Sequence, residues 1–385
     1  MHGDVLCLSH LRWGFVYQRP HHLMSRFARD SRVFFVEEPI FDADVAHLVM
    51  HEVEPHLTLA VPHLPPDQPP DVVIASQRAL LDQLVAQRHI SRPLLWFYTP
   101  MALTFAGHLE GAVTVYDAMD ELSGFDGAPP ELRARERELF SRADVVFTGG
   151  HSLYEAKKSA HPRVYPFPSS VDAAHFARAR SGGLVEPADQ ASIPHPRLGF
   201  FGVVDERMDL RLLAQVADAH TWWDVVVVGP VVKIDPAFIP VRPNLRFLGA
   251  KKYDELPAYL AGWDVALMPF AQNDATRFIS PTKTLEYLAA GKPVVSTPIR
   301  DVVRPYGEQG LVRIGEGRAF VAAVEEAIAE RDKPEEAARR EAADQLVAQT
   351  SWDRTFSQMV ELIREATARR ARTSEVKGAG MEAAT

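Results

Sequence analysis

The chain of 385 residues has one cysteine, Cys7, so no internal disulfide can form and no site built from several cysteines can hold a metal. Cys7 lies in the apolar run Val5–Leu8, which predicts a small core residue rather than a nucleophile. Nowhere do about 18 apolar residues follow one another, so we expect no membrane-spanning helix. The first strand is predicted to begin almost at once, so we expect no signal peptide and a cytoplasmic location.

Long basic tracts are also missing, and the formal net charge is −9. This balance argues against nucleic acid as a partner, while local basic spots still permit a peripheral contact with an anionic membrane surface. Hydrophobic residues make up 46% of the chain and charged residues 24%, which is typical of globular proteins. The length favours two domains.

Short apolar runs alternate with helical patterns through both halves, which is the signature of βαβ units and parallel sheets. In the first half the predicted strands are Val5–Leu8, Val33–Val36, Leu57–Val61, Leu94–Tyr98, Val113–Tyr116, Val145–Thr148 and Val164–Phe167. In the second half they are Leu198–Phe201, Val225–Val228, Leu245–Leu248, Val265–Met268 and Pro293–Ser296. The fold class is therefore α/β.

Two Rossmann-like, doubly wound domains are predicted, 1–180 and 197–350, facing each other across a cleft. The segment 181–196 is rich in Gly, Pro, Ser and Asp without periodicity, so we expect an interdomain linker. An amphipathic helix over 351–371 is predicted to return to the first domain, and 372–385 is predicted to be a disordered tail.

The most informative stretch is SPTKTLEYLAAGKPVV, residues 280–295. Ser280 is a favoured N-cap and Pro281 fits the first helical position, so a helix is predicted to start there. Thr282 adds a hydroxyl and Lys283 a positive charge at that end, which predicts a seat for a diphosphate. Glu286 lies one turn deeper and can accept hydrogen bonds from ribose hydroxyls. The alternative is that Lys283 and Glu286 form an ordinary surface pair.

This stretch resembles the donor-binding segment of family-4-like glycosyltransferases of the GT-B fold, the glycosyl transferases group 1. The resemblance implies that Lys283 or its neighbouring backbone holds a nucleotide diphosphate and that Glu286 holds the ribose. It also implies a nucleotide-sugar domain in the second half, an acceptor domain in the first, and retaining chemistry. Such enzymes often carry a second glutamate near the transferred sugar, eight positions earlier, where this chain has Phe278.

Two further loops of the second half belong to the predicted donor site. Gly202 ends a strand where backbone is expected to pass close to a ligand, and Arg207 follows five residues later. In the resembling family this loop clamps the diphosphate, so Arg207 is the predicted clamp, with a helix-surface arginine as the alternative. The segment around Leu248 and Gly249 resembles the nucleobase loop. No G-x-G-x-x-G motif follows any strand, which argues against a dinucleotide-binding dehydrogenase.

In the first half, polar and aromatic residues crowd the predicted carboxyl end of the first strand. Trp13 and Gln18 suit contact with a sugar by stacking and hydrogen bonding, and Arg19 is added to this acceptor side. The neighbouring doublet His21–His22 lacks the spacing of further metal ligands, so no metal site is predicted.

Carboxylates follow another buried strand at Asp117, Asp120 and Glu121. Glycosyl transfer needs a base for the acceptor hydroxyl or electrostatic support for a positive anomeric carbon, so Asp117 and Asp120 are the predicted catalytic residues. The alternative is that these carboxylates cap the next helix. His151 follows a further strand and is a secondary acceptor-side candidate.

The leading hypothesis is a glycosyltransferase of hexosyl type that moves a sugar from a nucleoside diphosphate sugar to a hydroxyl acceptor. The acceptor is expected to be a glycan, a lipid-linked sugar or a small molecule, in cell-surface polysaccharide or glycolipid synthesis. No cofactor and no metal are expected, because Arg207 and Lys283 would neutralise the leaving diphosphate. A nucleotide-sugar epimerase or hydrolase, and a non-catalytic nucleotide-sugar binding protein, remain alternatives.

Overall fold

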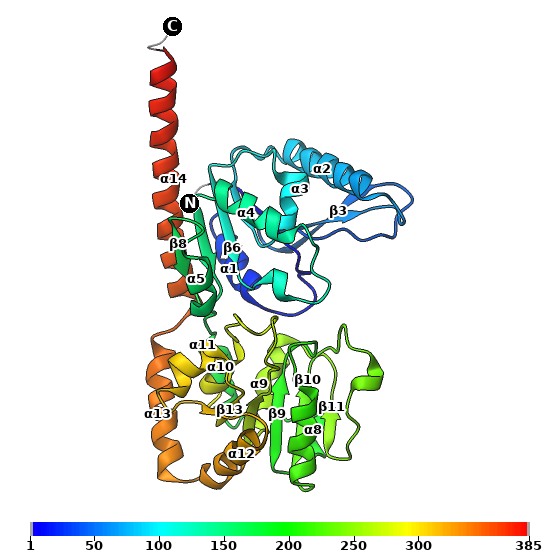
Figure 1. The fold of residues 1–385 in the computed structure, drawn as a ribbon, viewed down its shortest axis with the longest axis vertical. Coiled ribbons are helices and arrows are strands. Elements are labelled where there is room, and N and C mark those ends of the chain that lie inside the picture. Colours follow the sequence, from blue (N-terminus) through cyan, green and yellow to red (C-terminus); the bar gives the residue numbers. More distant parts are fainter. Residues whose placement is uncertain (1–2, 383–385) are drawn as a thin grey trace.

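The computed structural model describes residues 3–382 and consists of two α/β domains with a long C-terminal helix (Figure 1). The first domain is built on an eight-stranded sheet of order β3-β4-β2-β1-β5-β6-β7-β8, in which all neighbours but β3 and β4 are parallel. Its strands are β1 (Val5–Leu8), β2 (Val33–Val36), β3 (His47–Glu54), β4 (Leu57–His63), β5 (Leu94–Phe97), β6 (Val113–Ala118), β7 (Val145–Thr148) and β8 (Val164–Pro166).

The central strands of this sheet are covered on both faces. Their helices are α1 (Arg19–Phe27), α2 (Pro70–Gln87), α3 (Leu103–Ala106), α4 (Leu132–Arg142) and α5 (His151–Lys157). Alternate residues of each central strand enter one of two apolar clusters; in β1, Val5 and Cys7 face one and Leu6 and Leu8 the other. Cys7 is fully buried there, in the core position that the apolar run predicts.

Strand β3 was not predicted from the sequence. It pairs with β4 at the antiparallel edge, and its side chains are exposed or half-buried throughout. Polar residues such as His47, His51 and Glu54 interrupt its apolar pattern, so it lacks the run of apolar residues by which the buried strands are recognised.

The second domain carries a six-stranded parallel sheet of order β11-β10-β9-β12-β13-β14. Its strands are β9 (Arg197–Phe201), β10 (Asp224–Val228), β11 (Leu245–Phe247), β12 (Val265–Met268), β13 (Val294–Ser296) and β14 (Arg313–Ile314). Its helices are α8 (Leu210–Ala219), α9 (Leu256–Ala261), α10 (Lys283–Ala289), α11 (Arg300–Val302), α12 (Arg318–Glu330) and α13 (Pro334–Ala348). The strand order reverses between β9 and β12, and such switch points are where doubly wound sheets bind ligands.

The predicted boundary at residue 180 and the predicted linker 181–196 need correction. The chain leaves the first domain soon after β8, because Val171 and Phe176 are already buried in the core of the second. The short helices α6 (Ala173–Ala177) and α7 (Ala188–Ala191) lie in this connection. Within α7, the buried side chain of Gln190 accepts a hydrogen bond from the indole of Trp263 at 2.9 Å. The lack of sequence periodicity in residues 181–196 therefore reflects a connection packed against the second domain and not a free linker.

The C-terminal helix α14 (Trp352–Glu382) crosses back to the first domain, as the fold prediction required (Figure 1). Trp352, Met359, Val360 and Ile363 are buried in the same cluster as the first sheet. The helix continues through Glu382, so the prediction of a disordered tail is wrong for residues 372–382. Residues 383–385 of that predicted tail lie outside the described residues.

Candidate functional site

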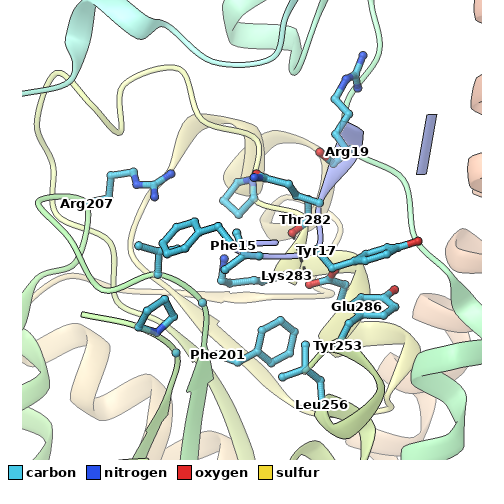
Figure 2. A pocket seen from close by; sticks show the side chains of 18 of the residues that line it. Phe15, Tyr17, Arg19, Phe201, Arg207, Tyr253, Leu256, Thr282, Lys283 and Glu286 are labelled. Carbon is cyan, nitrogen blue, oxygen red and sulfur yellow. Dashed lines mark hydrogen bonds between the residues drawn. The ribbon is translucent and has the colours of Figure 1, made fainter. Parts of the chain in front are cut away.

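A cavity of about 210 Å³ lies between the two domains, where the carboxyl ends of both sheets meet. The first domain contributes the loop after β1, from Phe15 to Arg19, together with Met119 and Asp120 after β6. The second domain contributes segments after β9, β10 and β11, together with the start of α10. Figure 2 shows side chains of many of the residues that line it.

The helix α10 begins at Lys283 with Thr282 as its N-cap, two residues later than predicted. The predicted roles of Ser280 as N-cap and Pro281 as first helical residue are therefore wrong. Thr282 has helical backbone angles and makes no capping hydrogen bond with its side chain. Ser280, Pro281 and Thr282 nevertheless line the cavity beside Lys283.

Lys283 extends into the cavity across Gly202. Its ammonium lies 5.5 Å from the centre of the Phe200 ring. A Cβ atom on Gly202 would stand 2.3 Å from Cε of Lys283, and Gly202 has a φ of +140°. The positive φ favours glycine there, because another residue would strain the backbone, and a side chain would also displace the end of Lys283. Burial lowers the pKa of Lys283, and Arg207 adds to that effect.

Glu286 lies one turn further along α10 and lines the same cavity. Its carboxylate accepts a weak hydrogen bond from the hydroxyl of Thr282 at 3.4 Å. Burial raises the pKa of Glu286 from 4.5 to about 7, against the opposing effect of the Lys283 ammonium. Perturbed carboxyl groups in a cleft are typical of binding and catalytic sites. The predicted pair is therefore a cavity pair and not a surface pair.

Arg207 lies in the loop between β9 and α8 and also lines the cavity. Its guanidinium donates to both carboxylate oxygens of Asp205, at distances from 2.6 to 3.1 Å. The ring of Phe125, from the first domain, lies 5.4 Å from its Cζ atom. Asp205 thus holds the arginine in place at the cavity wall, a partner that the sequence prediction did not consider.

The predicted nucleobase loop is displaced by two residues. Leu248 and Gly249 are absent from the cavity lining, where Ala250 and Lys251 stand instead. The backbone N–H of Leu248 donates to the carbonyl of Val227 at 2.8 Å, and the carbonyl of Gly249 accepts from the N–H of Gly229 at 2.8 Å. These two groups are therefore used to hold the edge of the sheet.

Two of the predicted first-domain residues, Arg19 and Asp117, form a buried ion pair at the cavity wall. Asp117 is 0% exposed, and Arg19 donates to its two carboxylate oxygens at 2.9 Å each. Arg19 also donates to the carbonyl of Phe167 at 2.7 Å. Asp117 is not among the cavity-lining residues, so its predicted position beside the reacting carbon is wrong. Arg19 itself lines the cavity, where its acceptor-side role was predicted, while its guanidinium is held by Asp117 and by the carbonyl of Phe167.

Asp120 is the first-domain carboxylate that does line the cavity. It lies close enough to Arg207 and Lys283 for both cations to oppose the effect of burial, which raises its pKa. The chain thus brings one predicted catalytic residue, Asp120, to the predicted donor-binding cations across the domain boundary.

Of the remaining acceptor-side candidates, one lines the cavity and two do not. Gln18 lines the cavity. Trp13 does not, because its ring packs on His21 at 4.2 Å and on Phe35 at 5.1 Å. His151 is exposed at the start of α5 and is also absent from the cavity lining. The residue that follows it, Ser152, donates its backbone N–H to both carboxylate oxygens of Asp301 in the second domain, at 2.9 and 3.2 Å.

Sequence reasoning missed two tyrosines at one end of the cavity, Tyr17 and Tyr253. Their rings stack across the domain boundary with centroids 4.3 Å apart. Neither sits in a motif with recognisable spacing, and their proximity depends on the docking of two domains, so no local signal was available. Phe278 lies outside the cavity and packs against the first-domain core.

Among residues 3–382, no group of three or more His, Cys, Asp or Glu side chains is placed to hold a metal ion. The same part of the chain contains no helix that is long and apolar enough to cross a membrane.

Comparison with known proteins agrees with this architecture. Residues 195–330 match the family described as glycosyl transferases group 1. A Bacillus subtilis (strain 168) protein named as a teichuronic acid biosynthesis glycosyltransferase, TuaH, is 27% identical over 239 residues, 57% of this chain. The alignment spans only 59% of that relative's length. The family match and this relative support a glycosyltransferase function.

Solved structures resemble the whole chain. A sucrose-phosphate synthase from Thermosynechococcus elongatus matches with a TM-score of 0.71 at 13% identity, covering 95% of this chain and 100% of that one. An E. coli trehalose-6-phosphate protein bound with UDP-2-fluoro glucose gives 0.69 at 11% identity, covering 95% and 99%. A trehalose-phosphate synthase from Burkholderia xenovorans, in complex with glucose-6-phosphate, gives 0.67 at 12%, covering 94% and 100%. These likenesses confirm the predicted GT-B fold.

Proposed function

Because the chain has the GT-B fold and its residues 195–330 match the glycosyl transferases group 1, we propose that it transfers a hexose-type sugar from a nucleoside diphosphate sugar to a hydroxyl acceptor. The observation that carries this proposal is the convergence of Lys283, Arg207 and Glu286 on one cavity between the domains. Two cations suit a diphosphate, and a carboxylate beside them suits ribose hydroxyls.

In the proposed reaction the bond between the anomeric carbon and the diphosphate oxygen breaks, and the acceptor oxygen bonds to that carbon. The electron pair leaves with the diphosphate, whose charge Lys283 and Arg207 neutralise. Asp120, opposite these cations, supports the positive charge that develops on the sugar. The acceptor's proton passes to the departing phosphate oxygen or to Asp120. This assignment replaces Asp117, which is buried with Arg19.

We further propose that the transfer retains the anomeric configuration and needs neither a metal nor another cofactor. Retention rests on the resemblance of residues 280–295 to the family segment, and metal independence rests on the two cations at the diphosphate position. NMR of the anomeric proton in the product tests the first. Unchanged turnover after treatment with EDTA tests the second.

The acceptor is proposed to be a growing cell-surface polysaccharide or a glycolipid, at the cytoplasmic face of the membrane. The relative named for teichuronic acid biosynthesis supports this choice. The similar structure bound with UDP-2-fluoro glucose makes UDP-sugars the first donors to test.

A thermal-shift panel of UDP-, GDP-, ADP- and dTDP-sugars should reveal one donor that raises the melting temperature. Arg207→Ala and Glu286→Ala should each reduce that shift strongly while the unliganded protein stays folded. Arg211→Ala, in helix α8 of the same domain but outside the cavity lining, is the matched control. Normal turnover in both site variants would refute the placement of the site.

Incubation with the selected donor alone separates transfer from two related reactions. Transfer predicts that release of the nucleoside diphosphate depends on an added acceptor. Rapid release of free or epimerised sugar without an acceptor would instead identify a hydrolase or an epimerase. Binding of the donor without turnover on any acceptor, unaffected by Asp120→Asn, would indicate a binding protein.

A further inference from the structure

The ring of Tyr253 is held between two other rings at one end of the cavity. Tyr253 opens the short 3₁₀ helix Tyr253–Glu255 that follows β11. On one side lies Tyr17 of the first domain, with ring centroids 4.3 Å apart and planes at 26°. On the other lies His175, at 4.2 Å and 7°, whose Nε2 is 3.1 Å from the backbone carbonyl of Tyr253. The position of the Tyr253 ring is therefore fixed by both domains.

The hydroxyl of Tyr253 takes no part in this ring packing. Its oxygen is buried, and it has no hydrogen-bond partner among the residues that the structure describes. A buried hydroxyl without a partner costs free energy, so native proteins satisfy nearly all of them. Stacking alone would be served equally well by phenylalanine. The hydroxyl therefore requires a separate explanation.

Glu286 provides the context for that explanation. Tyr253 and Glu286 line the same cavity, and Figure 2 shows them close together at the end opposite Arg207. Burial and the Glu286 carboxylate both raise the pKa of Tyr253, so the phenol keeps its proton. An ionised Glu286 only accepts hydrogen bonds, whereas a neutral phenol both donates and accepts.

We propose that Tyr253 is a second ribose-contact residue, whose hydroxyl completes the site for the vicinal hydroxyls of the donor together with Glu286. This inference rests on the proposed function, because it assumes a nucleoside diphosphate in the cavity. The ligand it selects is a ribonucleotide. A 2′-deoxy or 3′-deoxy analogue would leave the Tyr253 hydroxyl or the Glu286 carboxylate unpaired, and sites built around a substrate hydroxyl reject such analogues.

The test uses isothermal titration with the ribonucleoside diphosphate chosen from UDP, GDP and ADP, and with its 2′-deoxy and 3′-deoxy forms. The wild-type chain should bind the ribonucleotide about tenfold or more tightly than at least one deoxy form. Tyr253→Phe keeps the stacked ring and should weaken ribonucleotide binding about fivefold to tenfold. Binding of the deoxy form that lacks the contacted hydroxyl should not change.

Tyr306→Phe is the matched control, because it removes a tyrosine hydroxyl from the same domain outside the cavity. Since Tyr306 is not among the cavity-lining residues, the loss of its hydroxyl should leave nucleotide affinity unchanged. Equal affinity of the wild-type chain for all three nucleotides would overturn the proposal, even if Tyr253→Phe failed to fold. So would a Tyr253→Phe variant that binds the ribonucleotide normally, or one that loses affinity equally for all three. Failure of the wild-type chain to bind any nucleoside diphosphate would instead refute the proposed function.

Discussion

The titration of Glu286 gives the sharpest test of the donor site. Burial raises the pKa of Glu286 to about 7, so the side chain changes charge within the range where enzymes are normally assayed. Only the ionised carboxylate accepts hydrogen bonds through both oxygens. If Glu286 holds the ribose, the affinity for a nucleoside diphosphate must fall as the carboxylate takes up a proton. Glu286→Gln keeps the size of the side chain and removes the titration.

The size of this effect follows from the pKa. With a value of about 7, roughly nine-tenths of Glu286 is ionised at pH 8 and roughly one-tenth at pH 6. If the protonated form contributes little, the affinity should fall about tenfold between these two pH values, which corresponds to about 1.4 kcal/mol. Because the bound form favours the ionised carboxylate, binding at pH 6 should also release a proton.

Isothermal titration at pH 6, 7 and 8 measures this effect, with two buffers of different ionisation enthalpy to count the released proton. The phosphates of the nucleotide titrate in the same range, but they do so equally for both proteins. The ratio of the wild-type and Glu286→Gln dissociation constants therefore isolates the carboxylate. The ratio should change about tenfold between pH 8 and pH 6, and the variant should release fewer protons.

Parallel pH profiles in the wild-type chain and the variant would refute the reasoning. Such a result would mean either that Glu286 does not contact the nucleotide or that its pKa lies outside this range. The size of the Glu286→Gln effect separates the two: a loss of nucleotide affinity that is constant from pH 6 to pH 8 indicates contact with a pKa outside this range, and no loss at any pH indicates no contact. Inorganic pyrophosphate is the ribose-free control: Glu286→Gln should affect its binding much less than nucleotide binding, and an equal effect on both would contradict the ribose assignment.

Three further predictions concern stability. Because the pKa of Glu286 is raised on folding, the free energy of unfolding that its protonated side chain contributes is fully present below pH 4.5 and is lost as pH rises through 7. Glu286→Gln should therefore stabilise the unliganded protein at pH 8 by up to about 3 kcal/mol and hardly at pH 4.5, as measured by urea unfolding. Arg19→Ala leaves the carboxylate of Asp117 buried without its partner, which should cost about 3–5 kcal/mol in the same assay. Asp301→Ala removes the acceptor for the Ser152 backbone N–H at the start of α5, and should lower stability by about 1 kcal/mol. A Glu286→Gln stability gain independent of pH, or no loss in the other two variants, would contradict the corresponding contact.

Strand positions could be predicted from the sequence because the strands buried on both faces are continuous apolar runs. Val265–Met268 and Val5–Leu8 were located without error. The edge strand His47–Glu54 was not predicted, because its side chains are exposed or half-buried and its sequence therefore mixes polar and apolar residues. Helix ends were less certain, since Ser280 and Pro281 satisfy the rules for a helix start and the chain still delays the first helical residue to Lys283.

The shared cavity position of Lys283 and Glu286 could be predicted because both lie on one short segment with a specific pattern. Lys283 and Glu286 are three residues apart on one helix, so local geometry alone brings them to the same cavity. The first-domain carboxylates could not be ranked in this way. Asp117 lies near the end of β6 and Asp120 follows that strand, and only the position of Arg19, 98 residues from Asp117, determines which of them is buried in an ion pair. Tyr17 and Tyr253 meet only when two domains dock.

The two halves of the site depend on each other, because their residues come from different domains. The residues proposed to bind the diphosphate and the ribose belong to the second domain, whereas Asp120 and Tyr17 reach the cavity from the first. The proposed reaction therefore requires the domains to be in contact, and donor binding alone does not assemble the catalytic carboxylate. The contact between Asp301 and Ser152 spans the domains without lining the cavity. Weakening it should for this reason lower turnover more than donor affinity, since the donor contacts on α10 remain while Asp120 is less often in place.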